Sequence, residues 1–375
     1  MSGHVRQRGK NRQWYAVIDV IKDGKRKRHW QKLEGTYTGK REAQKACERL
    51  IAQQDEGTYV DPSKMPVAGF VRSRIDQWEA ADDITARTAQ RYRQLATNQI
   101  APHIGTKPLQ KLSRLDLEAW HTALRNGGLA PRTIGHAHRV LSKALRDAEK
   151  DNLIVKNATK LQRAPKVADN EVTLVPDIPA LLAQLKDWRH GMVAMVALFT
   201  GMRLGEVLAL RWTNVDLDAK VIKVREALEQ TAAFGIRFKP PKSKAGRREI
   251  TLPDILVDAL REHRKAQLEL RMQLGVGRLP DDALLFATIE GRPWAPNLLS
   301  TLWLNFARSI RMSEVTFHAL RHTHASQLID QGVDIVTISK RLGHAKPDIT
   351  LRTYAHMFRK DDSRAAAAIN AAMKW

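Results

Sequence analysis

The sequence predicts a multidomain chain with three successive parts. The first is a small α+β N-terminal domain, a three-stranded sheet plus one helix, the second is an all-α domain, and the third is a mixed, mainly helical domain with a small antiparallel sheet. Three observations favour this fold class. The 375 residues exceed the usual size of one domain, about 100–200 residues. The hydrophobic period changes along the chain from alternating to helical, and two stretches of linker composition separate the patterns.

The N-terminal part combines a strand pattern with a concentration of positive charge. The first 32 residues hold ten Lys or Arg against two Asp. The β-forming stretches 14–20 and 27–33 can pair as a hairpin around a short turn. Apolar residues then recur at helical spacing over residues 40–54. We therefore expect a small basic sheet backed by one helix, in a domain that covers residues 1–62.

The middle part shows only helical periodicity, which predicts an all-α domain over residues 66–162. A stretch rich in Gly, Pro and Ser precedes it, and a polar stretch that ends in Ala-Pro-Lys follows it. The predicted helices are 70–78, 85–99, 113–124 and 131–150. Near the start of the last one lie Arg132, Thr133 and Arg139, and we expect them to contact phosphate because free backbone N–H groups add to the positive charge there. A solvated helix face is the plain alternative.

The third part, residues 168–375, mixes helices and strands. Apolar spacing predicts helices at 179–185, 192–199 and 254–273 and from Asn297 onward. Short β-forming runs predict strands at 220–224 and 248–252.

The composition indicates an anionic partner. With 63 Lys+Arg against 40 Asp+Glu the formal net charge is +23, which repels itself unless an anion such as nucleic acid is bound. An anionic membrane surface is the competing partner, but the chain lacks an apolar run of about 18 residues and an apolar signal segment. Cys47 is the only cysteine, which excludes an intrachain disulfide. We expect a soluble intracellular protein without a membrane partner.

Two kinds of DNA chemistry are disfavoured by what the sequence lacks. Metal-dependent nucleases need clustered carboxylates that hold two cations, and Glu249, Asp254 and Asp258 are too scattered for this. A Walker-type phosphate loop is missing as well. We therefore expect no metal and no nucleotide cofactor. Cleavage of DNA would then need a nucleophile, a cationic clamp on the phosphate and a proton donor, all supplied by side chains.

The C-terminal half of the chain holds candidates for these roles. Tyr354 is the only tyrosine after Tyr92, so it is the one tyrosine nucleophile available there. His318 and Arg321 share a helix face, where a guanidinium can bind two phosphate oxygens and an imidazole can exchange protons near neutral pH. His344 precedes Tyr354 by ten residues. Each residue alone is more often structural, and a tyrosine packed on an amphipathic helix is the ordinary alternative for Tyr354.

A further candidate, Arg203, lies where an apolar helix breaks at Gly201 and the chain restarts as a helix. Glu206 follows one turn later on the same side and can hold the Arg203 side chain in position. A simple buried ion pair between Arg203 and Glu206 is the structural alternative.

Three segments carry a resemblance to a known family. They are TGMRLGEVLALRW at 200–212, HALRHTHASQLIDQG at 318–332 and RLGHAKPDITLRTYAH at 341–356. Their order and spacing resemble those of tyrosine recombinases over the whole C-terminal half of the chain. The helical domain resembles the core-binding domain of that family. The basic sheet and helix resemble the arm-binding domain of its phage and mobile-element integrases, so the chain resembles a lambda-integrase-like enzyme.

The resemblance implies a role for each candidate. Arg203 and Arg321 would clamp the scissile phosphate while Tyr354 attacks phosphorus, which gives a 3′-phosphotyrosyl enzyme and a free 5′-hydroxyl. His318 would take the proton of the phenol, whose ordinary pKa is about 10. His344 would donate a hydrogen bond to the phosphate. Because the tyrosyl linkage stores the phosphodiester energy, religation would need neither ATP nor metal.

The family's general acid is a lysine in a β-hairpin turn, and this chain offers several basic residues there. Lys242 fits best by its distance from the following strand, and Lys244 is second. Lys239 competes as well. Arg247 and Arg248, with the lysines that are not the acid, are expected to contact the DNA backbone.

The resemblance also implies the partners. They are double-stranded DNA at core-type and arm-type sites and three further copies of the chain in a homotetramer, while a host DNA-bending protein and an excisionase stay open. The N-terminal residues expected to contact DNA are Arg26, Lys27 and Arg28. The tail from Ser363 to Trp375 is apolar on one face and is expected to pack on a neighbouring protomer. The implied location is the cytoplasm, at the nucleoid, in a bacterial or phage-encoded protein.

Two alternatives remain beside an integrase that integrates or excises a mobile element. A dimer-resolving recombinase of the Xer type shares the chemistry but usually lacks the N-terminal unit. A non-catalytic DNA-binding regulator built on the same clamp would bind without a covalent intermediate, and the complete set of candidate catalytic residues argues against it.

Overall fold

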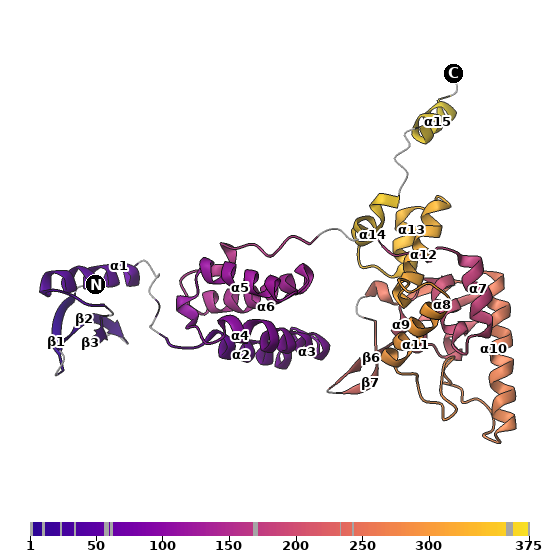
Figure 1. Cartoon of the computed structure of the whole chain (residues 1–375), viewed down its shortest axis with the longest axis horizontal. Coiled ribbons are helices and arrows are strands. Elements are labelled where there is room, and N and C mark those ends of the chain that lie inside the picture. Colours follow the sequence, from indigo (N-terminus) through magenta and orange to yellow (C-terminus); the bar gives the residue numbers. More distant parts are fainter. Residues whose placement is uncertain are drawn as a thin grey trace. The chain divides into compact units, whose positions relative to one another are not determined.

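The chain divides into two compact units, residues 1–169 and 170–375 (Figure 1). The computed structural model describes residues 3–9, 12–22, 25–33, 35–55, 60, 63–167, 172–232, 234–241, 244–357 and 363–373. The first unit holds a small sheet with one helix and a helical bundle. The second unit mixes helices with short antiparallel strands, so the predicted fold class is confirmed.

The N-terminal sheet is antiparallel and three-stranded, in the order β1-β2-β3. Its strands are β1 (Gly3–Arg8), β2 (Gln13–Lys22) and β3 (Lys25–Lys32). The helix α1 (Lys40–Asp55) lies along the sheet (Figure 1). Apolar side chains of alternate strand positions, such as Val5 and Ile18, meet Ala43 and Cys47 of the helix and are buried. This core explains why the strand and helix patterns follow each other in the sequence.

The helical bundle of the first unit has a continuous apolar core. Its helices are α2 (Val67–Ala80), α3 (Ala86–Leu95), α4 (Ala101–Ile104), α5 (Arg114–Asn126) and α6 (Pro131–Lys150), with a π turn at Ala96–Ile100 and 3-10 turns at Leu109–Lys111 and Ala158–Lys160. The starts follow local chemistry: the Thr85 side chain caps α3, and Ser113 and Asp116 form a capping box at α5. Pro131 opens α6. The four helical segments predicted for this region are therefore confirmed.

The second unit packs its helices around a core that also covers one small sheet. The helices are α7 (Ile178–Asp187), α8 (Gly191–Thr200), α9 (Leu204–Leu208), α10 (Asp254–Gln273), α11 (Pro296–Ser309), α12 (Phe317–Asp330), α13 (Ile335–Leu342), α14 (Pro347–Tyr354) and α15 (Ser363–Ala372). The strands are β4 (Val215–Asp216), β5 (Val221–Val224), β6 (Ala227–Thr231), β7 (Gly235–Lys239) and β8 (Arg248–Thr251). The antiparallel sheet β4-β5-β8 contains both predicted strands. The separate hairpin β6-β7 and strand β4 are not predicted.

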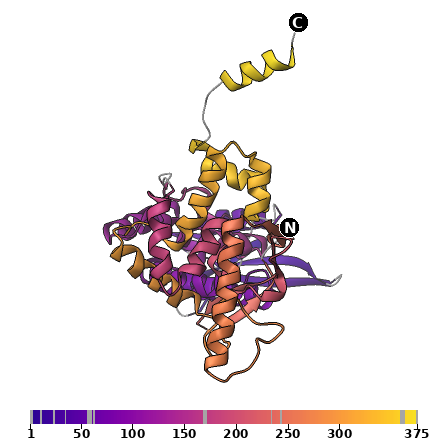
Figure 2. The same cartoon turned by 90° about the vertical axis from the view of Figure 1, so that its right-hand side faces the viewer.

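Helix α10 is a long helix, and the chain returns from its C-terminal end through an irregular segment, residues 274–295 (Figure 2). This segment is fixed to the unit by backbone hydrogen bonds, such as the one from the Leu285 N–H to the Leu210 carbonyl (2.8 Å). The segment therefore belongs to the packed body of the unit although it contains no helix or long strand.

Two glycines in the left-handed conformation allow neighbouring side chains to pack closely against the ends of α8 and α13. Gly201 ends α8 with φ 68°, and Gly343 ends α13 with φ 71°. A Cβ atom on Gly201 would lie 2.7 Å from the His324 ring and 2.8 Å from Leu342. A Cβ atom on Gly343 would lie 2.8 Å from the Arg248 guanidinium. Both positions therefore need glycine for its backbone conformation and for the close approach of neighbouring side chains.

Candidate active site

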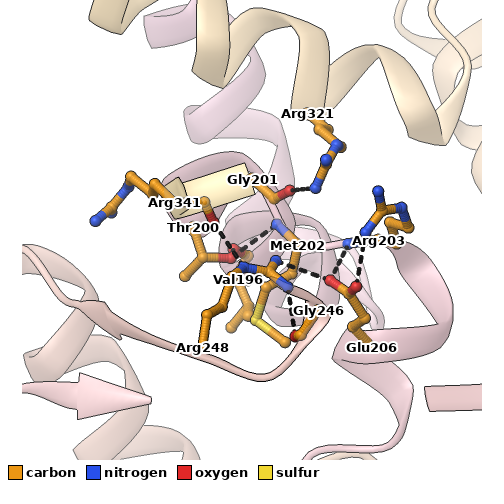
Figure 3. Close-up of polar contacts among 10 residues, drawn as sticks. All are labelled: Val196, Thr200, Gly201, Met202, Arg203, Glu206, Gly246, Arg248, Arg321 and Arg341. Carbon is orange, nitrogen blue, oxygen red and sulfur yellow. Dashed lines mark hydrogen bonds and ion pairs between the residues drawn. The ribbon is translucent and has the colours of Figure 1, made fainter. Parts of the chain in front are cut away.

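Arg203 lies at the break between α8 and α9 and is held by Glu206. Its backbone N–H donates to Glu206 Oε2 (3.0 Å), and its Nη1 donates to Glu206 Oε1 (2.9 Å). The Glu206 residue is 4% exposed, whereas 44% of the Arg203 side chain is open to solvent. Figure 3 shows that the guanidinium is anchored through one edge. The other edge of the guanidinium can therefore bind an anion.

A second arginine, Arg248, also binds Glu206, at the oxygen that accepts from the Arg203 backbone N–H. Arg248 Nη2 lies 2.9 Å from Glu206 Oε2, Nε donates to the Arg341 carbonyl (2.6 Å) and Nη1 to the Gly246 carbonyl (3.2 Å) (Figure 3). Burial alone would raise the pKa of Glu206, but the charges of Arg248 and Arg203 and their hydrogen bonds outweigh it, and the pKa is lowered. Glu206 is thus an anion between two cations.

The prediction that Arg248 contacts the DNA backbone is wrong. Its side chain is only 6% exposed, and its guanidinium is occupied by three acceptors from the second unit. The signal available in the sequence is weak, because Arg248 follows Arg247 at the start of a strand and nothing local distinguishes the two. Arg247 itself is exposed. Arg248 instead links the basic turn, Glu206 and the end of α13.

Arg321 reaches the same region from α12 and is almost completely buried, with 2% of the residue exposed. Its Nη1 donates to the Gly201 carbonyl (2.5 Å) (Figure 3). Its Nη2 is buried and has no hydrogen-bond partner among the described residues. Burial and the nearby Arg203 lower the pKa of Arg321 to about 9, so the guanidinium stays charged at neutral pH. A buried charged donor without an acceptor is unfavourable, and an anion bound beside Arg203 would satisfy it.

The two predicted histidines lie around these cations. His318 is near the start of α12, and His344 follows Gly343 and shares a 2.7 Å hydrogen bond between its Nδ1 and Thr350 Oγ1. Burial lowers the pKa of each histidine, and nearby positive groups, Arg321 among them, lower it further, to about 4. The His318 residue is nonetheless exposed to solvent. Both rings are therefore neutral at pH 7.

Tyr354 ends α14 and is buried, with 1% of the residue exposed. Its ring packs in a small apolar cluster with side chains of α12 and α13. The hydroxyl lies 2.8 Å from Nδ1 of His322. Burial raises the pKa of Tyr354 to about 12, and the charge of Arg321 opposes this rise. The nucleophile candidate is thus a neutral phenol at neutral pH, within the electric field of one of the two arginines.

His318 is the residue predicted to take the proton of Tyr354, whereas in the structure His322 is hydrogen-bonded to the Tyr354 hydroxyl. His318 instead meets the His322 ring edge to face, with the centroids 4.7 Å apart. Sequence reasoning missed His322, although it follows Arg321 directly and lies four residues after His318 on the same helix. Helical spacing alone would have placed it beside His318.

The lysine predicted as general acid cannot be placed, since Lys242 lies outside the described residues. The second candidate, Lys244, is exposed in a 3-10 turn, Lys244–Gly246. The third, Lys239, is bound to the buried Glu229 through Nζ and Oε1 (2.5 Å). Lys239 is therefore committed to an ion pair within the β6-β7 hairpin.

The predicted DNA contacts lie on two elements of the first unit. Arg26, Lys27 and Arg28 are on β3, where Arg28 is exposed and the side chains of the other two lie outside the described part of the chain. Arg132 and Arg139 are exposed on α6, seven residues apart and thus on one face. The Thr133 N–H is not a free donor, because it bonds to the Ala130 carbonyl (2.9 Å). The argument from free N–H groups is therefore wrong for Thr133.

Within the described residues, no three His, Cys, Asp or Glu side chains lie close enough together to hold a metal ion. No helix among those residues has the length and apolar composition needed to cross a membrane.

Comparison with known proteins places this site in a family. The model of the phage integrase family matches residues 172–361. A tyrosine recombinase XerC-like protein of Caldanaerobacter subterraneus subsp. tengcongensis is 27% identical over 69% of this chain and 71% of its own length. An integrase of Streptomyces ambofaciens is 26% identical over 93% of this chain and 91% of its own length.

A solved structure has the same fold. The integrase of transposon Tn1549, in complex with the transposon's right-end DNA, superposes with a TM-score of 0.70 at 20% identity, over 82% of this chain and 99% of that one. The matched family region contains Arg203, Arg321, His344 and Tyr354, which the second unit gathers around one buried cationic centre. The chain therefore belongs to the phage integrase family and is a tyrosine-type site-specific recombinase.

Proposed function

We propose that this recombinase cuts and rejoins double-stranded DNA through a 3′-phosphotyrosyl bond to Tyr354, without metal or ATP, to integrate or excise a mobile element. The observation that carries the proposal is the Nη2 of Arg321, a buried cationic donor without an acceptor in the described structure, close to the half-open guanidinium of Arg203. Two guanidiniums fixed in this way suit the non-bridging oxygens of one phosphodiester.

The clamp is fixed before DNA arrives. Glu206 and the Gly201 carbonyl each hold one arginine by a hydrogen bond of 2.9 Å or less. Donors that are already oriented need no rearrangement as negative charge builds up on the phosphorane oxygens, and this is the main source of their effect on rate. Arg203 and Arg321 therefore act as the phosphate clamp.

The phosphate also changes the protonation of the histidines. Besides burial, the charges of Arg321 and Arg203 lower the pKa of His318 and His344. A bound phosphodiester carries a negative charge that offsets the guanidiniums, so both pKa values rise toward the ordinary value. His344 then donates a hydrogen bond to the phosphate through Nε2, since its Nδ1 is used by Thr350. His318 provides a second polar contact to the phosphate.

The basic turn supplies the proton for the leaving 5′-oxygen. Lys242 is the first candidate and Lys244 the second. Lys239 is bound to Glu229 and is the weakest of the three. Single-turnover cleavage by Lys242→Ala and by Lys244→Ala tells the two candidates apart. Only loss of the general acid should lower the cleavage rate more than about 100-fold.

The domain roles follow the three-part division of the chain. Residues 1–62 bind arm-type sites through the basic β3 strand with Arg26, Lys27 and Arg28. Residues 66–162 bind core-type sites, with Arg132 and Arg139 on one face of α6, and residues 168–375 form the catalytic domain. Two separate apolar cores in the first unit support this division. Each phosphate contact removed should lower the slope of log affinity against log salt by about 1.

The assembly is a tetramer on paired sites, joined by the C-terminal tail. Ile369 of α15 and Met373, which follows the helix, are 56% and 65% exposed, so this part of the tail presents apolar surface that no described residue covers. We expect that surface to pack on a neighbouring protomer. Deleting residues 363–375 should abolish synapsis while DNA binding by single protomers persists, and synapsis by the truncated chain would contradict this assignment.

The test of the function starts from DNA of unknown target sequence. A library of duplexes with a randomised central stretch is incubated with the enzyme in EDTA, the reaction is stopped with SDS, and protein-linked DNA is recovered and sequenced. We expect covalent complexes from the wild type and none from Tyr354→Phe. Complexes that persist in Tyr354→Phe, or that require added Mg²⁺, would contradict the proposed chemistry.

The closest alternative is a dimer-resolving recombinase, favoured by the similarity to a XerC-like relative. The sheet and helix before residue 62 favour the integrase role, because they resemble an arm-binding domain. If deletion of residues 1–62 left recombination between two identical core sites as efficient as in the full chain, the resolving role would be preferred.

A further inference from the structure

The hydroxyl of Tyr354 has one described hydrogen-bond partner, His322. The Oη to Nδ1 distance is 2.8 Å, and the rings of the two residues meet edge to face at 5.7 Å between centroids. The phenol is 1% exposed, and apolar side chains that include Ile338 and Leu342 surround the ring. Bulk water therefore has little access to the hydroxyl, and a proton that leaves it must pass to a protein group.

A base at this point is needed because burial raises the pKa of Tyr354 to about 12. Burial and the neighbouring Arg321 lower the pKa of His322, so its ring is neutral at pH 7 and can accept a proton. In the neutral tautomer that carries its hydrogen on Nε2, His322 accepts at Nδ1 and the Tyr354 hydroxyl donates to it. The acceptor is already in contact before the reaction starts.

His318 offers a route for the proton to leave. It precedes His322 by one helical turn, the two rings meet edge to face at 4.7 Å, and His318 is exposed to solvent. The ionisable groups that face His322 are therefore His318 and Arg321 from α12 and Tyr354 from α14. Arg321 disfavours a permanent charge on His322, and this favours return of the proton during religation.

We infer that His322, and not His318, is the catalytic base that takes the proton of Tyr354. As Oη bonds to phosphorus, the O–H bond breaks and the proton moves to Nδ1 of His322. The bond from phosphorus to the 5′-oxygen breaks with its electron pair on that oxygen, and the oxygen takes a proton from the lysine of the basic turn. Religation reverses both transfers. The inference rests on the proposed function and adds a residue role to it.

Two substitutions separate proton transfer from positioning. His322→Gln keeps an acceptor for the phenol but cannot take a proton, and His322→Ala removes both. His263→Gln is the matched control, because His263 is a partly buried histidine of the same unit that bonds to the Leu285 carbonyl (2.8 Å), and its described partners include none of the candidate catalytic residues. Thermal melting of each full-length variant checks the fold.

The assay is single-turnover cleavage of a nicked duplex built from a sequence recovered by covalent trapping. A second duplex carries sulfur in place of the bridging 5′-oxygen, so that its leaving group needs no proton. We expect both His322 variants to cleave about 10²–10⁴-fold more slowly than the wild type, on the oxygen and on the sulfur duplex alike. Variants that lack the general-acid lysine should regain most of the wild-type cleavage rate on the sulfur duplex.

The possible outcomes separate this inference from the proposed function. If the wild type forms no covalent complex, the proposed function fails and the inference fails with it. If the wild type cleaves and His322→Gln cleaves within threefold of it or faster, the hydrogen bond only holds the phenol, and the inference alone is overturned. Recovery of His322→Gln on the sulfur duplex would also overturn it, because His322 would then act on the leaving group.

Discussion

The helical bundle at 63–167 and the catalytic centre of the second unit bury different kinds of polar group. The buried polar side chains described in the bundle are neutral, for example the His121 and His138 pair. In the second unit the buried groups include the charged Glu206 and Arg321. Buried charge usually lowers stability relative to an apolar residue, so the two buried charges at the catalytic centre, Glu206 and Arg321, indicate a functional rather than a stabilising role.

The most demanding test of this difference between the two regions replaces the buried cation Arg321. Arg321→Met keeps an unbranched side chain but removes the charge and the unpartnered Nη2. We expect cleavage to fall by about 10³-fold or more, since a preorganised donor to the phosphate is lost, while the melting temperature stays unchanged or rises. Single-turnover cleavage and thermal melting measure the two effects. A large drop in melting temperature would show that Arg321 is mainly structural.

The limits of sequence reasoning follow the same division. The helices at Pro131–Lys150 and Asp254–Gln273 are predicted with their observed bounds, because apolar spacing and a proline near the first turn are local signals. Arg248 and His322 are missed because their partners come from far along the chain. The Arg248 contact to the Arg341 carbonyl spans 93 residues, and the Tyr354 contact to His322 spans 32. Only packing brings these groups together.

The hairpin β6-β7 shows another limit. Its inner positions include the charged Glu229, which is buried between Arg237 and Lys239. A buried carboxylate breaks the alternation of apolar and polar residues that identifies a strand. The five residues Arg203, His318, Arg321, His344 and Tyr354 could be selected from the sequence as one set, but the use of His322 as the hydroxyl partner could not.

A second prediction concerns the anion between the arginines. Glu206→Gln removes the charge that Arg203 and Arg248 share, and leaves the buried Arg248 guanidinium uncompensated. We expect a loss of about 3–5 kcal/mol in the free energy of unfolding together with slower cleavage. The bundle offers a control, Glu149→Gln, whose ion pair with Lys160 is more exposed, and this variant should lose much less stability than Glu206→Gln. Equal losses in both variants would contradict the comparison. Chemical denaturation measures them.

A third prediction removes an apolar side chain from the bundle. Leu141 is 0% exposed, so Leu141→Ala should lower the free energy of unfolding by about 2–5 kcal/mol through lost burial and the cavity left behind. At a temperature where the variant stays folded, cleavage of a saturating nicked duplex should stay within threefold of the wild type. A much larger loss of cleavage would mean that the bundle core also sets the geometry of the catalytic centre.

The smallest expected effect tests the neutral histidines of the bundle. Burial, His121 and Arg139 lower the pKa of His138 to about 4. Between that value and the ordinary one near 6.5 the unfolded chain binds a proton that the folded chain does not, so stability decreases as the pH falls through this window. From pH 7 to pH 5 the loss attributable to His138 is about 2 kcal/mol. Between pH 7 and pH 5 the stability of His138→Gln should therefore fall by about 2 kcal/mol less than that of the wild type. An identical pH dependence in the two proteins would contradict a neutral, buried His138.

The central claim is that the buried charges of the catalytic centre, Glu206 and Arg321, serve one reaction, attack by Tyr354 on a phosphodiester. Mass spectrometry of nuclease-trimmed covalent complexes tests it most directly, with the DNA labelled at either end to show which side stays attached. The predicted result is a nucleotide linked through its 3′-phosphate to the peptide that contains Tyr354. A nucleotide on another residue, or a linkage through a 5′-phosphate, would contradict the account.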